Sequence, residues 1–125
     1  MFEFMSNLEA AIFTDATSIG GYVFWDTRHT GSIGIDFYKT MTFPGATPFY
    51  LTNVDLDIIL RSSEMSTTTF TPSTWGIPPK MKFYVPSSLV NTYLADNNWS
   101  AFGSERILPI EETKYEDINW WKSII

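Results

Sequence analysis

The sequence has no cysteine and a single histidine, His29. Without cysteine there is no disulfide framework, thiolate nucleophile or cysteine-ligated metal, as is typical of a protein assembled in a reducing cytoplasm. A nucleophile–histidine pair or a histidine metal site would depend on His29 alone. Because His29 follows Arg28 in a polar connection, and no Gly-x-Ser-x-Gly motif accompanies it, we interpret it as a solvated loop residue.

Basic residues are also scarce. Eight Lys and Arg stand against 14 Asp and Glu, which gives a formal net charge of −6. Such a surface repels a phosphate backbone, so nucleic-acid binding is not expected. No apolar run approaches the length of a membrane span, and residues 1–5 lack the basic stretch and apolar core of a signal peptide. We therefore expect neither a membrane span nor a secretory signal.

Acidic side chains occur in pairs, but the pairs lack catalytic or ligand spacing. They are Asp55 with Asp57, Glu111 with Glu112, and Glu116 with Asp117. Asp55 and Asp57 would share one face of a strand, yet the glycine and distal glutamate of a calcium loop are missing, so we interpret them as solvent-facing strand residues. We expect no metal, no cofactor and no enzymatic activity. A glycan hydrolase is the least favoured alternative.

What the chain does have is aromatic surface and a period. Ten Phe, six Tyr and five Trp are far more than a disordered segment carries, and 125 residues suffice for one domain with a core. Apolar clusters recur around Ile12, Ile35, Ile58, Phe83 and Ile107, at gaps of 23, 23, 25 and 24 residues. Periods in the twenties are typical of solenoids that contribute one strand per repeat to a parallel sheet. An antiparallel domain with evenly spaced strands is the alternative.

The segment from 81 to 110 gives the most specific local prediction. A strand over 81–85 should end at Pro86, which donates no hydrogen bond, and Ser87 is placed to cap a short helix. The apolar face of that helix comprises Leu89, Val90, Tyr93 and Leu94. The polar run 96–98 should end the helix, after which Trp99 and Phe102 fold back onto the core.

The motif in this segment reads Val85-Pro86, Leu89-Val90, Tyr93, Asn98-Trp99-Ser100, Arg106-Ile107 and Pro109-Ile110. Over residues 56–112 the chain closely resembles the terminal unit of BspA-like leucine-rich repeat proteins. The resemblance implies a mainly β fold: a short leucine-rich-repeat or β-solenoid-like stack of parallel strands with a short helix in the C-terminal capping unit. Residues 1–113 would then be one repeat-like domain.

Such terminal units are common in bacterial surface proteins and in bacteriophage virion proteins of the tail, baseplate or fibre. The resemblance therefore implies a non-enzymatic structural protein of a virion, made in the host cytoplasm and placed in the tail, baseplate, fibre or head decoration. Its partners would be other virion proteins and further copies of itself. The alternative is an adhesion module that contacts host surface carbohydrate through Trp75 and Trp25.

Residues 67–79 are rich in Thr, Pro and Gly, and we expect them to form a wide surface loop. Trp75 lies in this segment. An exposed Trp would be an ordinary contact residue for a partner or a sugar. The other interpretation is that Trp75 folds under the loop and closes the end of the stack.

Residues 114–125 extend beyond the terminal unit. Glu116 and Asp117 suit the start of a helix, on which Ile118, Trp121 and Ile125 would share a face. Such an apolar segment is hard to bury on a small monomer, so we expect it to pack against another copy or another protein. The candidate partner-binding residues here are Trp120, Trp121, Ile124 and Ile125. The alternative is that the segment folds back over the open end of the stack.

Overall fold

The computed structural model describes residues 10–19, 32–44, 55–74, 77 and 79–123, and the structural statements below concern these residues. They form mostly strands, with one short α-helix and several 3₁₀ turns. A five-stranded, all-parallel sheet has the order β1 (Ala10–Phe13), β2 (Ser32–Phe37), β4 (Asp55–Leu60), β6 (Met81–Val85) and β7 (Ile107–Pro109). A second, two-stranded parallel sheet pairs β3 (Thr42–Phe43) with β5 (Thr67–Thr68). The prediction of a parallel, strand-rich fold with a short helix is confirmed.

The strand register repeats along the sheet. Ile35 pairs with Ile58, Ile58 with Phe83, and Phe83 with Ile107, so four of the five predicted cluster centres form one row across the sheet. The first strand departs from the predicted spacing, because Ala11 rather than Ile12 pairs with Ile35. Since a shift of one residue exchanges the faces of a strand, Ala11 lies in the main core and Ile12 on the opposite face.

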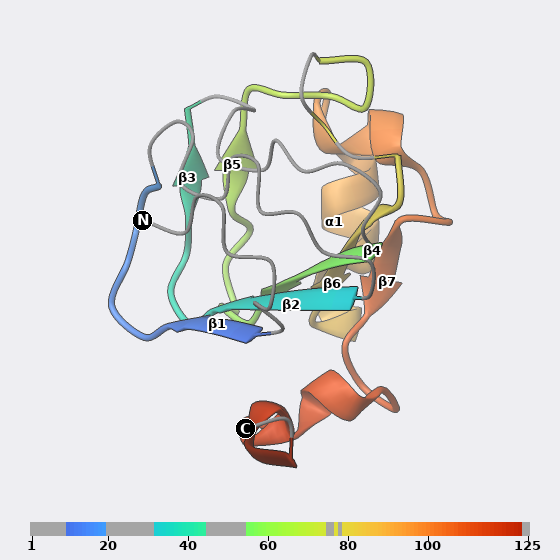
Figure 1. Ribbon diagram of the computed structural model, residues 1–125. Helices are drawn as coiled ribbons and strands as arrows, with labels where there is room; N and C mark the ends of the chain where they lie inside the picture. The colour runs from blue at the N-terminus through green and yellow to red at the C-terminus, as the bar shows by residue number, and fades with distance from the viewer. Residues whose placement is uncertain (1–9, 20–31, 45–54, 75–76, 78, 124–125) are drawn as a thin grey trace.

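Alternation along the strands divides the sheet into two covered faces. One face belongs to a large apolar core, which on the strands comprises Ala11, Ile33, Ile35, Phe37, Leu56, Ile58, Leu60, Met81, Phe83, Val85 and Ile107. The opposite face, called the outer face below, packs a separate cluster that includes Ile12, Ile59 and Tyr84. In Figure 1, β3, β5 and α1 lie on the core side, and the C-terminal segment lies beyond the other side. Burial on both faces is the usual condition of a parallel sheet.

The small sheet continues the pairing on the far side of the main core. The carbonyls of Met41 and Phe43 accept hydrogen bonds from the N–H groups of Thr67, at 2.9 Å, and Thr69, at 3.2 Å. The predicted surface loop therefore begins with a strand, and its Thr68 side chain is buried. The loop prediction was wrong for these residues, because their strand signal depends on pairing 25 positions earlier in the chain rather than on local composition.

The helix follows the prediction with one correction. A 3₁₀ turn, Ser87–Leu89, leads into α1 (Val90–Ala95), and Tyr93 is fully buried. Ser87 does not cap the helix. Its N–H and its hydroxyl instead donate to the carboxylate of Glu111, at 2.9 and 3.3 Å, because the turn after β7 brings a charged acceptor next to it.

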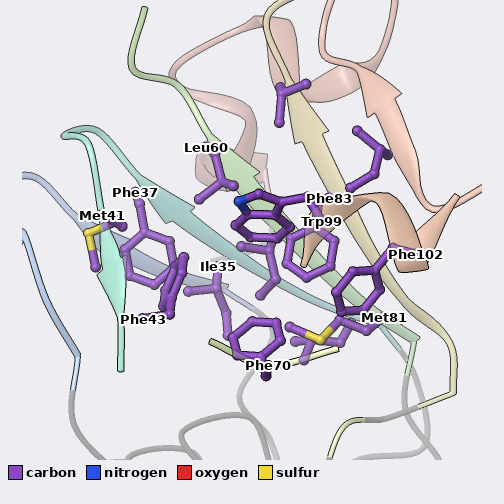
Figure 2. Packing of buried hydrophobic residues seen from close by; sticks show 14 of the residues in the cluster. Ile35, Phe37, Met41, Phe43, Leu60, Phe70, Met81, Phe83, Trp99 and Phe102 are labelled. Carbon is purple, nitrogen blue, oxygen red and sulfur yellow. The ribbon is translucent and has the colours of Figure 1, made fainter. Parts of the chain in front are cut away.

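Trp99 is the centre of the main core, as its predicted return to the core requires. Its indole is completely buried, and Figure 2 shows it close to Leu60 and Phe83. The ring centroid of Phe83 is 4.9 Å away, and that of Tyr93 is 5.2 Å away, both in edge-to-face geometry. Phe102 is also buried, as predicted. Edge-to-face pairs of this kind add to the stability gained from burial alone.

Side chains of the C-terminal unit complete the hydrogen bonds of the small sheet. The carbonyls of Ser66 and Thr68 are one repeat beyond those of Met41 and Phe43. They accept from Trp99 Nε1, at 2.8 Å, and from Asn98 Nδ2, at 2.6 Å. Two side-chain N–H groups therefore occupy the positions that backbone N–H groups occupy in the preceding repeat. Buried carbonyls need such partners, so the motif has a direct structural reason.

Candidate functional site: the outer face and the segment that covers it

The outer face carries a buried carboxylate in the middle of the parallel sheet. Asp36, on β2, is fully buried between Ile12 and Ile59 of the neighbouring strands. Arg61, directly after β4, neutralises it: its Nε donates to both carboxylate oxygens, at 2.9 and 3.0 Å, and its terminal nitrogen lies 2.8 Å from Oδ2. A buried carboxylate requires this combination of opposite charge and directed hydrogen bonds.

Trp120 supplies the third donor to this carboxylate. Its Nε1 donates to Asp36 Oδ2 at 2.8 Å across 84 positions of sequence. The indole lies directly over Gly34, where a Cβ atom would overlap the ring at Cη2. Gly34 and Asp36 are two residues apart and share the outer face, so together they provide a flat site for the ring and an acceptor for its N–H. Glycine inside a strand often marks such a close approach.

Tyr115 covers the neighbouring part of the outer face. Its ring centroid is 4.9 Å from that of Tyr84 and 4.9 Å from that of Trp120, in the latter case edge to face. Its hydroxyl donates to the carboxylate of Asp57. Burial, followed by the hydrogen bond to Asp57, raises the pKa of Tyr115 far above its usual value, so this hydroxyl is a proton donor at physiological pH.

The segment that provides these two aromatic rings is called the tail below, and its described residues are 114–123. It forms two short 3₁₀ turns, Lys114–Glu116 and Trp120–Ser123, instead of the predicted single helix. The reason is local: Thr113 Oγ1 accepts from the N–H of Tyr115, and Asp117 Oδ1 accepts from the N–H of Asn119, so side chains break the segment into two turns.

The predicted partner-binding residues have different positions. Trp120 is buried against its own chain, so in this state its ring is an internal contact, and the tail covers the outer face rather than the open end of the stack. Trp121 is half-buried, and Ile118 is 45% exposed. Ile124, Ile125, Trp75 and Trp25 lie outside the described residues. Partner binding by the tail stays a prediction, as does sugar binding by the two loop tryptophans.

Asp36, Arg61 and Gly34 were missed by the sequence prediction. The available signal was an acidic residue two positions after a glycine within an otherwise apolar strand, which places both on one buried face. Asp55 is exposed and lies 3.8 Å from Lys80, in agreement with its interpretation as a solvent-facing residue. Asp57 was assigned the same role, but it is half-buried and bonded to Tyr115.

In the described part of the chain, no group of three or more His, Cys, Asp or Glu residues is arranged to hold a metal ion. Likewise, no helix there has the length and apolar character needed to cross a membrane. The charged and aromatic groups of the outer face contact one another, so the chemistry of this site is that of packing and recognition. Comparison of the chain with protein-family models, curated proteins and solved structures gives no match.

Proposed function

We propose that this chain is a non-enzymatic structural protein of a bacteriophage virion, made in the host cytoplasm and placed in the tail, baseplate, fibre or head decoration. The observation that carries the proposal is the closure of the small sheet. Asn98 and Trp99 of the Asn-Trp-Ser motif supply the donors that a further repeat would supply through its backbone. This is what a terminal unit must do, and it supports the resemblance to BspA-like terminal units, which are common in virion proteins.

The corresponding fold is a short leucine-rich-repeat-like solenoid. Its support is that each repeat pairs with the next at two separate places. The main sheet aligns strands at offsets of 23 to 25 residues, and the small sheet does so at 25. The pairing also extends back toward the N-terminus, where the N–H of Thr42 donates to the carbonyl of Thr17 at 2.9 Å. Repeats paired in this way bury their apolar side chains only by stacking.

Assembly contacts are the activity of such a protein, and the exposed side of the tail is the surface we assign to them. Ile118 is an exposed large apolar side chain, and it follows the exposed acidic residues Glu116 and Asp117. An apolar centre with an acidic border fits a partner surface that is apolar with basic residues around it. Charge complementarity of this kind selects the partner, and the apolar centre contributes the affinity.

Binding of the full-length protein to the separated proteins of purified particles tests this proposal. Ile118→Asp should weaken binding to the partner by about tenfold or more, because it places a charge in the apolar centre. Ser123→Asp is the matched control, since it adds the same charge at an exposed polar position of the tail and should leave binding unchanged. Absence of binding to any particle protein, or equal binding by both variants, would contradict the proposal.

A further inference from the structure

The outer face is shaped for one particular occupant, the tail. Recognition combines a ring site over Gly34, which lacks the Cβ that would overlap Trp120, with a hydrogen bond from that ring to Asp36. A second pair, the hydroxyl of Tyr115 with Asp57, fixes the register of the tail along the sheet. Each pair joins a specific donor to a specific buried or half-buried acceptor. Any chain that presents the same tail meets the same requirements.

The turn that carries the tail to its own outer face is strained at one residue. Glu112 is exposed and has φ +69°, in the left-handed region that residues with a Cβ disfavour. The turn around it is closed by Thr113, whose N–H and hydroxyl donate to the carbonyl of Ile110 at 3.3 and 2.7 Å. An opened turn would remove the unfavourable φ angle of Glu112. It would also send the tail away from its own sheet.

We propose that two copies of this chain exchange tails, each tail occupying the outer face of the other copy. Exchange repeats every contact of Trp120 and Tyr115 between chains, so the closed and exchanged forms differ mainly in the turn at Glu112 and in the cost of association. Strained, short hinges favour this route to a dimer. The inference rests on the proposed function, since it states how copies are joined in an assembly.

Complementation between two full-length variants tests the exchange. Gly34→Leu blocks the outer face but keeps an intact tail, and Trp120→Ala keeps the face but lacks the ring. Neither variant has a complete site alone, whereas a mixture has one complete site across the two chains. Native mass spectrometry should find at least about tenfold more mixed dimer than either variant forms with itself. The control is the double variant mixed with itself. A mixture equal to the sum of its separate components would overturn the proposal.

The hinge gives an independent test that leaves both binding surfaces intact. Glu112→Gly accepts the left-handed φ and should shift the protein toward the closed monomer. Glu112→Pro fixes φ near −65°, excludes the closed turn and should increase the exchanged dimer. Unchanged or reversed dimer fractions would contradict the exchange. A monomeric protein that still binds particle proteins would refute the exchange alone, whereas an exchanging protein that binds no particle protein would refute the proposed function alone.

Discussion

Replacement of Trp99 tests how the stack is closed. The indole is fully buried and forms ring contacts with Phe43, Phe70, Phe83 and Tyr93 at centroid distances from 4.9 to 6.4 Å. Truncation of a buried aromatic side chain to alanine costs about 3–5 kcal/mol. Because Trp99→Ala also leaves a buried carbonyl without its donor, we expect a loss near the upper end of that range, about 4–5 kcal/mol.

Trp99→Phe separates the hydrogen bond from the packing. Phenylalanine keeps an aromatic ring in the core but cannot donate to the carbonyl of Ser66, so a loss of about 1–3 kcal/mol is expected from the unsatisfied acceptor. Asn97→Ala, at an exposed position two residues earlier, is the control and should stay within about 0.5 kcal/mol of the original protein. The assay is equilibrium unfolding in urea, followed by far-UV circular dichroism. A loss below about 1 kcal/mol for both Trp99 variants would refute the closure argument.

Three further perturbations concern the outer face. Gly34→Ala should cost about 1–3 kcal/mol and displace the tail, with Trp120 becoming accessible to acrylamide quenching, because the new methyl group overlaps the indole; unchanged quenching would contradict the ring site. Asp36→Asn should cost about 3–5 kcal/mol in urea unfolding, since it leaves the guanidinium of Arg61 buried without its counter-charge; a near-neutral effect would show that the pair is dispensable. The raised pKa of Tyr115 means that the folded state disfavours its ionised form, so its contribution to stability is complete below pH 10 and decreases as the pH rises above 10; pH-dependent urea unfolding should show a smaller alkaline loss in Tyr115→Phe.

The spacing of apolar clusters was enough to predict the parallel sheet, because Ile35, Ile58, Phe83 and Ile107 lie one per repeat and face one core. The same signal failed by one residue in β1. Both faces of that strand are covered, so Ala11 and Ile12 are both apolar, and their pattern does not tell which of them points into the main core.

The terminal unit was predicted in more detail than the tail, for a physical reason. The helix and the return of Trp99 depend on contacts within about one repeat, which local periodicity reports. The docking of the tail depends on Asp36 and Asp57, which lie 84 and 58 positions from their partners. No local pattern encodes such distances. Only the unusual Gly34 and Asp36 within a buried strand hinted that another segment covers them.

Quantitative mass spectrometry of purified phage particles from the host that produces this chain tests the central claim most directly. A structural virion protein should copurify with the particles through a density gradient, at a fixed copy number relative to the major capsid or tail protein, and should remain after a high-salt wash. The account predicts this constant stoichiometry. Recovery of the chain only in the particle-free fraction of the lysate would contradict it.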